Sequence, residues 1–445
     1  QRLGNDRLAD MAFRAGLERA HPDMAVGFTS PLLIAGADSL EDAALFWEQN
    51  DPLLLTSYNE RQLAHYARVA FADLVYAADF LDLRGWETRR GQIFIRYGAP
   101  LYERTIAPPG AELIRYAIWE YDDFQFVFHD EYRSGEFTLF TPSARDIGLG
   151  VVPDVGEADY VIQARDMART MPQRYTFDPG GVRIAADVRT ASFRGTGNTT
   201  DLIVAYGMPV GGANTGMEEP SAEVGVFLGA GPGRLEVRDT LGGRVAQLAR
   251  LGDAATLLLG QLPMVARPGV QRLSVELMGI ANRVTAVHRS VVDVPAFPQG
   301  TFAVSDLLPA YGVDEAYDDS PSHPAFVTRG DLRILAAPTA AFDRSRPLYL
   351  YFEIYDLAPA ADGIARYELE IDLTREGGGG LLSLFRSSPR GVSVQFPGEV
   401  KGRNVSTYQI LDVADQEPGS YVLTLIVRDV QTGERRTRTQ EIVLQ

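Results

Sequence analysis

The chain contains 445 residues with a net charge of −17 at neutral pH, and 45% of its residues are hydrophobic. This length suits about three or four domains, and the apolar content excludes global disorder. The acidic balance disfavours nucleic acid and anionic membrane surfaces as partners, because phosphate groups need a basic face.

The chain has no cysteine, which excludes disulfides, thiolate metal sites and a cysteine nucleophile. No apolar run reaches the ~18 residues of a membrane-spanning segment, so no transmembrane helix is predicted. The sequence starts at Gln1 rather than at methionine, so either an export signal was removed or the sequence begins within a longer gene, and removal of a signal is the favoured interpretation. We therefore expect a location in the periplasm, on the outer-membrane surface or outside the cell.

Residues 1–84 have the hydrophobic periodicity of helices. A first helix is predicted over 3–20, and it is similar to half of a helical-hairpin repeat. A second helix is predicted over 38–49 and a longer one over 57–82. This part of the chain is therefore expected to be a helical region.

The hydrophobic period changes to two after residue 91, which is typical of strands. The predicted strands cover residues 91–98, 114–123, 124–131 and 135–142. A helix is predicted to follow over 157–172. Residues 85–175 are therefore expected to form a small α+β module.

Strand and glycine signals dominate the rest of the chain. Region 176–298 holds seven short strands at near-regular spacing, which predicts a β-sandwich. Region 299–345 is expected to be a connecting segment with an acidic loop, and 346–445 a second sandwich of immunoglobulin-like type. Its last two strands form a hairpin around Gln431-Thr432-Gly433. The whole chain is predicted to be a multidomain α+β protein with N-terminal helices, a small α+β module and two β-sandwich domains.

A joint pattern of glycine and aromatic residues runs through residues 40–145. Its main members are Gly85, Trp86, Thr88, Tyr97, Gly98, Pro100, Trp119 and Tyr121. In residue type and spacing the pattern resembles the bacterial GWxTD domain family, which is named for its Gly-Trp-x-Thr-Asp motif. The final aspartate of that motif is Arg89 here, so any role of that carboxylate is lost or reversed in charge.

The resemblance implies a module placed between helical repeats and β-sandwich domains, and it carries over no enzymatic activity to this chain. We expect Trp86 to cover a seam between a helix and the sheet. Gly85 and Gly98 would supply turn conformations closed to larger residues, and Thr88 would bond a local backbone group. This structural role is favoured over binding or catalysis, because large aromatic residues are mostly buried.

Five histidines are present, and none has the spacing of a metal motif. His129 is the best acid–base candidate, because four carboxylates lie near it in the sequence. Alternation along a strand places His129 and Asp130 on opposite faces, so a packed histidine is the favoured interpretation. No catalytic residue and no enzyme activity is predicted.

An acidic loop follows residue 311. Its carboxylates, Asp314, Glu315, Asp318 and Asp319, are candidate ligands for Ca²⁺, which prefers oxygen donors. Their spacing matches no standard calcium loop, and a solvated acidic loop is the favoured alternative. No other cofactor is expected.

Four positions match short glycosylation patterns. Asn198 and Asn404 begin Asn-x-Ser/Thr sequons. Ser39 and Thr240 stand in Asp-Ser/Thr-Leu triplets, which resemble an O-glycosylation signal of some bacteria. Patterns this short also arise by chance, so they are hints of attached glycans.

Together these features predict a non-enzymatic structural or interaction protein of the cell envelope or exterior. It would be a subunit of a homo- or hetero-oligomer or filament, with partners bound by its sandwiches; edge strands pair readily between chains. The terminal strand 437–445 is the first candidate for such pairing. The alternative is a carbohydrate-binding or carbohydrate-processing surface module, whose aromatic strands 114–124 and 347–357 would stack on sugars. Burial of Trp119 and Tyr121 would remove its support in the first of these strands.

Overall fold

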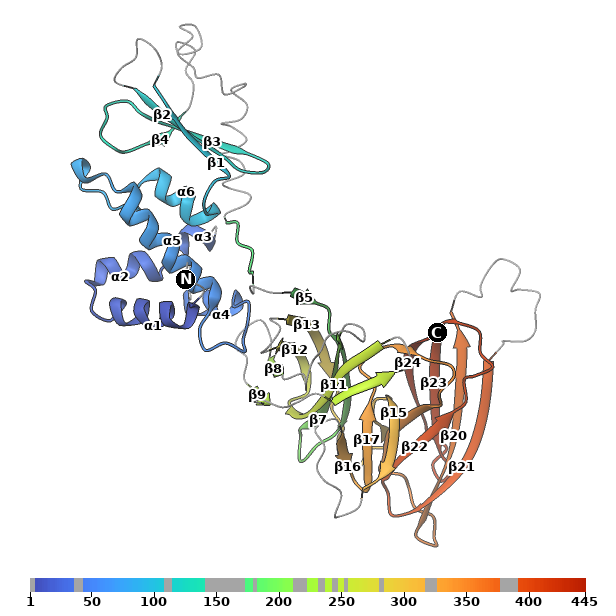
Figure 1. Ribbon diagram of the computed structural model, residues 1–445. Coiled ribbons are helices and arrows are strands. Elements are labelled where there is room, and N and C mark those ends of the chain that lie inside the picture. The colour runs from blue at the N-terminus through green and yellow to red at the C-terminus, as the bar shows by residue number, and fades with distance from the viewer. Residues whose placement is uncertain are drawn as a thin grey trace. The chain divides into compact units, whose positions relative to one another are not determined.

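The computed structural model of the chain divides after Asp178 into unit 1, residues 1–178, and unit 2, residues 179–445 (Figure 1). The residues that the structure describes are 5–35, 43–107, 114–140, 173–178, 182–210, 222–230, 237–241, 247–251, 255–279, 284–316, 326–376 and 391–445. Within these ranges, the helices are all too short or too polar to cross a membrane.

Unit 1 opens with helices, several of which are capped by polar side chains. They are α1 (Asp6–Leu17), α2 (Pro22–Thr29), α3 (Leu32–Ala35), α4 (Ala43–Gln49), α5 (Glu60–Tyr76), the 3₁₀ turn η1 (Asp79–Leu81) and α6 (Arg89–Tyr97). Side chains of Asn5, Asn59 and Thr88 accept backbone N–H groups at the starts of α1, α5 and α6. α1, α4 and α5 confirm the three predicted helices within narrower limits, and residues 38–42 lie outside the described part.

The predicted strand over 91–98 is wrong, because these residues form helix α6. Gly91, Phe94 and Ile95 are buried together, as expected for positions three and four apart on one helical face. The alternating Ile and Phe suggested a strand, but the Thr88 cap and packing against α5 outweigh this local preference.

A four-stranded antiparallel sheet completes unit 1. Its strands, in spatial order, are β1 (Tyr102–Ile106), β2 (Arg115–Glu120), β3 (Gln125–Asp130) and β4 (Thr138–Leu139). One face of this sheet shares an aromatic core with α5 and α6, which includes Tyr76, Phe94 and Trp119. β2, β3 and β4 confirm predicted strands, whereas β1 was not predicted. The helix predicted over 157–172 lies outside the described residues.

Unit 2 consists of four sheets, which we number I to IV. Sheet I has the order β5 (Val182–Ile184), β13 (Val284–Val294), β12 (Gly269–Gly279), β8 (Ala222–Ala230), β9 (Val237–Leu241). Sheet II has the order β10 (Gln247–Leu251), β11 (Ala255–Ala266), β7 (Thr200–Val210), β6 (Asp187–Arg194). Most of the pairings are antiparallel, and β5 with β13 is a short parallel exception.

Sheets III and IV contain the C-terminal strands. Sheet III has the order β14 (Ala303–Val304), β19 (Leu348–Tyr355), β15 (Leu308–Glu315), β17 (Leu332–Ala336), β16 (Val327–Arg329), and β22 (Val405–Leu411) also pairs with β19. Sheet IV has the order β18 (Ala341–Phe342), β24 (Arg435–Leu444), β23 (Gly419–Asp429), β20 (Ile364–Arg375), β21 (Gly391–Lys401).

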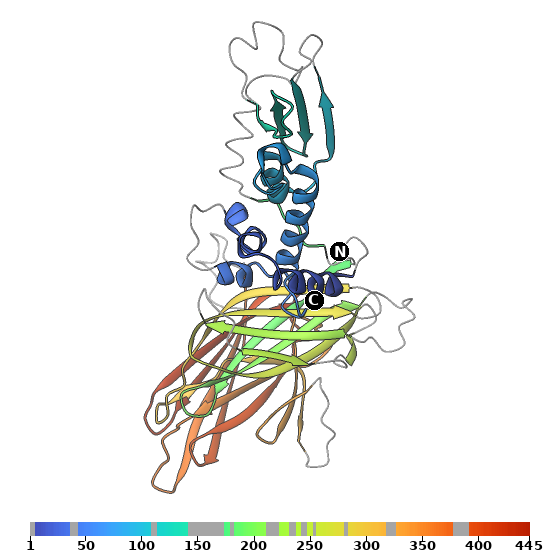
Figure 2. The same ribbon diagram turned by 90° about the vertical axis from the view of Figure 1, so that its left-hand side faces the viewer.

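Three hydrophobic cores place these sheets in the stacking order I, II, III, IV. Val204 of β7 packs in the core between sheets I and II, and its neighbour Ile203 packs in the core between II and III. Similarly, Leu350 of β19 packs in the core between sheets III and IV, and its neighbour Tyr351 packs in the core between II and III. Figure 2 shows the green and yellow strands on one side of the orange and red ones. Sheets II and III are therefore covered on both faces.

The segment 299–345 was expected to connect two sandwiches, but it supplies strands to sheets III and IV. β15 pairs with both β17 and β19, and β18 pairs with the end of β24. The C-terminal hairpin is confirmed: β23 and β24 are antiparallel neighbours, and Gly433 turns between them with a φ of 75°.

Candidate functional site

The Gly-Trp-x-Thr turn lies against the backbone of α5. A Cβ atom at Gly85 would lie 1.8 Å from the carbonyl oxygen of Ala72, so only glycine fits there. The N–H of Gly85 donates to Asp73 Oδ1 at 3.1 Å. Gly85 therefore fixes the close approach of this turn to α5.

Thr88 links the turn to the start of α6. Its buried hydroxyl donates to the Gly85 carbonyl at 2.8 Å and accepts the N–H of Gly91 at 3.2 Å. A Cβ atom at Gly91 would also lie 1.8 Å from the Gly85 carbonyl oxygen. Thr88 acts as the N-cap of α6 and has both hydroxyl functions occupied.

Trp86 packs against α2, whereas a seam between a helix and the sheet was expected. Its ring meets Phe28 of α2 edge-on at 5.7 Å between centroids. A Cβ atom at Gly27 would lie 2.8 Å from the indole, so α2 approaches the ring closely. The guanidinium of Arg84 lies over the indole, 5.8 Å from its centroid.

The later motif residues join α6 to the sheet. Gly98 ends α6 with a φ of 79°, and its carbonyl accepts the Tyr121 hydroxyl at 3.0 Å. Tyr97 and Trp119 are buried in the aromatic core, and Tyr121 is only 9% exposed. Pro100 is half-buried just before β1. Gly85, Thr88, Tyr97, Gly98, Trp119 and Tyr121 thus help to hold α5, α6 and the sheet together, whereas Trp86 packs against α2.

One face of α5 carries a buried and a half-buried arginine that the sequence patterns did not reveal. Arg61 donates through Nε to Gln173 Oε1 at 3.1 Å, and Arg68 donates to the carbonyls of Ile95 and Arg174 at 3.0 and 3.2 Å. Within the described ranges neither guanidinium forms an ion pair with a carboxylate. Their spacing on α5, with His65 between them, is the only sequence signal for this cluster.

Burial changes the protonation of this face. It lowers the pKa of Arg61 to about 10, with a further contribution from the charge of Arg68. It lowers the pKa of His65 to about 3, and both arginine charges add to this shift. His65 is therefore neutral at physiological pH. The cluster holds residues 173–175 against α5.

His129 and Asp130 point to opposite faces of the sheet, as alternation predicts. The His129 ring lies 5.4 Å from that of Phe140. Asp130 accepts the backbone N–H groups of Ser134 and Gly135 at 2.9 and 3.0 Å, which closes the turn to β4. This pair cannot act together as a base and its orienting carboxylate.

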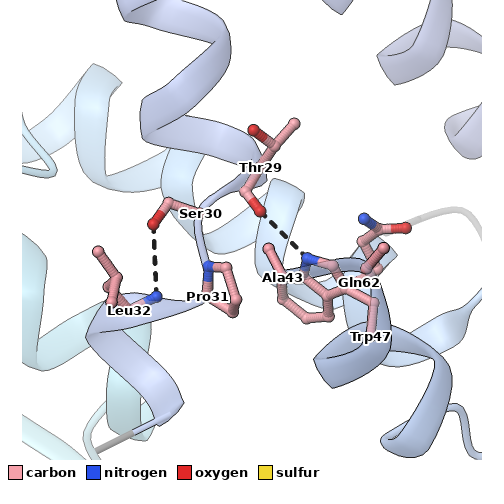
Figure 3. A pocket seen from close by; sticks show the side chains of 8 residues that line it. Thr29, Ser30, Pro31, Leu32, Ala43, Trp47 and Gln62 are labelled. Atoms are coloured by element: carbon pink, nitrogen blue, oxygen red, sulfur yellow. Dashed lines mark hydrogen bonds between the residues drawn. The ribbon is translucent and has the colours of Figure 1, made fainter. Parts of the chain in front are cut away.

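A hollow of about 430 Å³ lies beside α4 in unit 1 (Figure 3). Its wall includes Trp47, whose indole N–H donates to the Thr29 carbonyl at 3.1 Å, and the side chain of Gln62. Ser30 on the opposite wall accepts the N–H of Leu32 at 3.4 Å. Among the described residues that line it there is no carboxylate, histidine, lysine or arginine.

The calcium candidates are only partly described. Asp314 forms an ion pair with Arg333 at 3.2 Å, and Glu315 is exposed at the end of β15. Asp318 and Asp319 lie outside the described residues. In the part of the chain that the structure describes, no three acidic or histidine side chains are grouped as metal ligands would be.

The glycosylation candidates lie in different settings. Asn198 is exposed in the turn between β6 and β7. Asn404 uses its amide oxygen to accept the N–H of Asp356 at 2.9 Å. Thr240 lies on β9 opposite Gly225, and Ser39 lies outside the described residues.

The best-built polar centre of unit 2 lies between sheets II and III. Glu353 of β19 accepts Arg329 Nε at 2.9 Å and the hydroxyls of Tyr351 and Tyr355 at 2.6 Å each. Arg329 Nη1 also pairs at 2.6 Å with Asp201 of β7. Burial alone would lower the pKa of Arg329, but the two carboxylates raise it overall. Sequence patterns did not predict this centre, because its members come from strands far apart in the chain.

Comparisons with protein-family models and with curated proteins gave no match to this chain. Its function must therefore be argued from the geometry of its own residues.

Proposed function

We propose that this chain is a non-enzymatic structural or interaction protein of the cell envelope or exterior, and that it works as a subunit of a larger assembly. In this proposal residues 40–145 form a GWxTD-type module that holds the helical region to a small sheet. Unit 2 supplies two immunoglobulin-like sandwiches that contact protein partners.

The stack of four sheets in unit 2 is the observation that carries this proposal. A hydrophobic core and the Asp201–Arg329–Glu353 centre join sheet II to sheet III. Two sandwiches linked only by a flexible segment would move independently, whereas a shared core restrains them. A body of four restrained layers would hold its partners at fixed positions relative to one another.

The polar side chains of the motif support the same proposal. The hydroxyls of Thr88 and Tyr121 donate to backbone carbonyls of unit 1 itself, and the N–H of Gly85 donates to Asp73 of α5. A catalytic group must instead reach a substrate from an accessible position. The motif is therefore better suited to building the module than to chemistry.

The carbohydrate alternative loses its main support. Trp119 is fully buried and Tyr121 is nearly so, and on β19 the rings of Tyr351 and Tyr355 are also buried. Stacking on a sugar requires an accessible aromatic face. We therefore do not propose sugar binding at these strands.

Native mass tests the proposal directly. The full chain, drawn from the cells that produce it, would be passed through size-exclusion chromatography with light scattering. We expect a mass well above the 48.7 kDa of one chain. A stable monomer that carries no other chain would contradict the assembly role and return attention to ligand binding.

A further inference from the structure

Strand β22 (Val405–Leu411) has an open edge. Among the described strands it pairs only with β19. The backbone carbonyl of Glu353 accepts the Ser305 N–H on the side of β19 opposite to β22. The backbone N–H and C=O groups of the odd-numbered residues of β19 therefore point away from β22. The register of the pair then directs the N–H and C=O groups of Ser406, Tyr408 and Ile410 outward.

This edge also lacks charge. Residues 404–411 include no acidic or basic side chain, although 23% of the chain is charged. Ile410 is 55% exposed. Natural edge strands avoid the combination of free backbone groups, no charge and an exposed apolar side chain, because it templates pairing with another strand.

The edge of β24 is protected, although its sequence made it the first candidate for pairing. The N–H of Val443 donates to the carbonyl of Ala340 on the side of β24 opposite to β23. The backbone N–H and C=O groups of the odd-numbered residues of β24 therefore point to its outer edge. The outward carbonyls of Arg435, Thr437 and Glu441 already accept hydrogen bonds. Their donors are the side chains of Arg436, Arg438 and Gln440. These side chains occupy the acceptors that a new strand would need.

The edge of β21 is protected in a different way. The N–H of Glu376, just after β20, donates to the carbonyl of Ser420 on β23. The backbone N–H and C=O groups of even-numbered residues of β20 therefore point to β23, and those of odd-numbered residues point to β21. The register of β20 with β21 then places Pro397 on the outer edge of β21. Proline has no N–H to donate at that point. β22 therefore differs from both edges of sheet IV.

We infer that β22 pairs antiparallel with β22 of a second copy of this chain, around a two-fold axis at Tyr408. This inference rests on the proposed assembly role and names its interface. With Tyr408 opposite its own copy, Ser406 lies opposite Ile410 and every outward N–H meets an outward C=O. An uncharged edge meets its copy without repulsion, and it lacks the charges that would select a charged partner.

A single cysteine tests the register. Because the chain has no cysteine, Tyr408→Cys would introduce the only thiol. Opposed residues in a hydrogen-bonded antiparallel pair have Cα atoms about 5.5 Å apart, which is within disulfide range. Mild oxidation of the full chain should give a covalent dimer from Tyr408→Cys and none from Thr439→Cys, on the protected edge of β24. Equal cross-linking of the two variants, or none in either, would overturn the inference.

A proline substitution tests the edge itself. Ile410→Pro removes one outward N–H and leaves the bonds to β19, and Thr439→Pro makes the same change on β24. Light scattering should show dimers for the unaltered chain and for Thr439→Pro. For Ile410→Pro the dissociation constant of the dimer should rise on the order of tenfold or more. Ile410→Lys serves in its place if circular dichroism shows that the proline variant is unfolded.

The two proposals fail separately. If the assembly persists in Ile410→Pro and in Ile410→Lys, the β22 pairing is refuted and the assembly role still stands. The same holds if β22 binds a different protein chain and no second copy of this one. A monomer without partners refutes both.

Discussion

The residues of the Gly-Trp-x-Thr turn are explained by backbone contacts. Gly85 and Gly91 each occupy a place where a Cβ atom would collide with a carbonyl oxygen. Thr88 uses its hydroxyl as donor and as acceptor in the same turn. The sequence predicted the roles of Gly85 and Thr88, because glycine and a hydroxyl residue at a turn have few other uses, whereas Gly91 was expected in a strand. The partner of Trp86 was not predictable, since α2 lies some sixty residues earlier in the chain.

His65 should make unit 1 sensitive to acid. Its pKa falls from 6.5 unfolded to about 3 folded, because burial and the nearby charges of Arg61 and Arg68 disfavour the cation. A lowered folded pKa gives stability that is complete above pH 6.5 and is lost as the pH falls toward 3. Between pH 6 and pH 4 the unfolding free energy should fall by about 2 kcal/mol from this group alone.

Tryptophan fluorescence during urea unfolding can measure this loss, because all three tryptophans lie in unit 1. His65→Leu should flatten the difference between pH 6 and pH 4 relative to the unaltered chain. His21→Asn, at the exposed start of α2, is the matched control and should keep the full difference. An unchanged pH dependence in His65→Leu would show that the imidazole is not the responsible group.

At the scale of elements, α6 shows where local pattern and packing disagree. The run Gln92–Arg96 has three consecutive apolar residues between polar ones, and two of the three are β-branched isoleucines, which favours a strand. The Thr88 cap and a buried face against α5 favour a helix, and these contacts prevail. A capping residue three positions before a buried glycine was the signal that could have shown the helix.

Arg89 is a second feature of α6 that invites a test. It is exposed at the first position of the helix, where the unpaired N–H groups favour negative charge, and the first turn has no acidic residue. Arg89→Asp should therefore raise the unfolding free energy of unit 1 by about 0.5–1 kcal/mol at low salt. The gain should shrink in high salt, and Arg89→Ala should give only part of it. Urea unfolding followed by tryptophan fluorescence would measure this; equal gains from Asp and Ala would argue against a charge effect.

Strands with apolar alternation were predicted well, and polar edge strands were not. β7, β12 and β23 follow clear alternating or apolar runs. β1 and β22, by contrast, are rich in charged or polar residues and lie at sheet edges, where one side of the strand meets solvent. Their strand character comes from pairing with a neighbour, which periodicity does not report.

At the scale of the whole molecule, the stacking of sheets II and III was the least predictable feature. Each sheet has apolar residues on both faces, such as Ile203 and Val204 on β7. A run of this kind shows that a strand is covered on both sides. It does not show which sheet covers it, because that choice depends on contacts such as Asp201 with Arg329, 128 residues apart.

The Glu353 centre should contribute strongly to the stability of unit 2. Glu353→Leu would leave Arg329 with Asp201 as its only carboxylate partner among those described, and the hydroxyls of Tyr351 and Tyr355 without their acceptor. Breaking a buried ion pair from one side costs about 3–5 kcal/mol, whereas replacing both partners by apolar residues often costs much less. We therefore expect Arg329→Met combined with Glu353→Leu to regain part of the loss.

Far-UV circular dichroism during urea unfolding of the full chain would measure these changes, since the sheets of unit 2 dominate its strand content. Glu368 provides the matched control, because it pairs with Arg428 at 3.0 Å with both side chains well exposed. Exposed pairs contribute about 0–1 kcal/mol, so Glu368→Leu should change the unfolding free energy little. If Glu353→Leu costs no more than Glu368→Leu, the hydrophobic core alone joins sheets II and III. A large difference would show that the buried centre also helps to hold the four sheets in one stack.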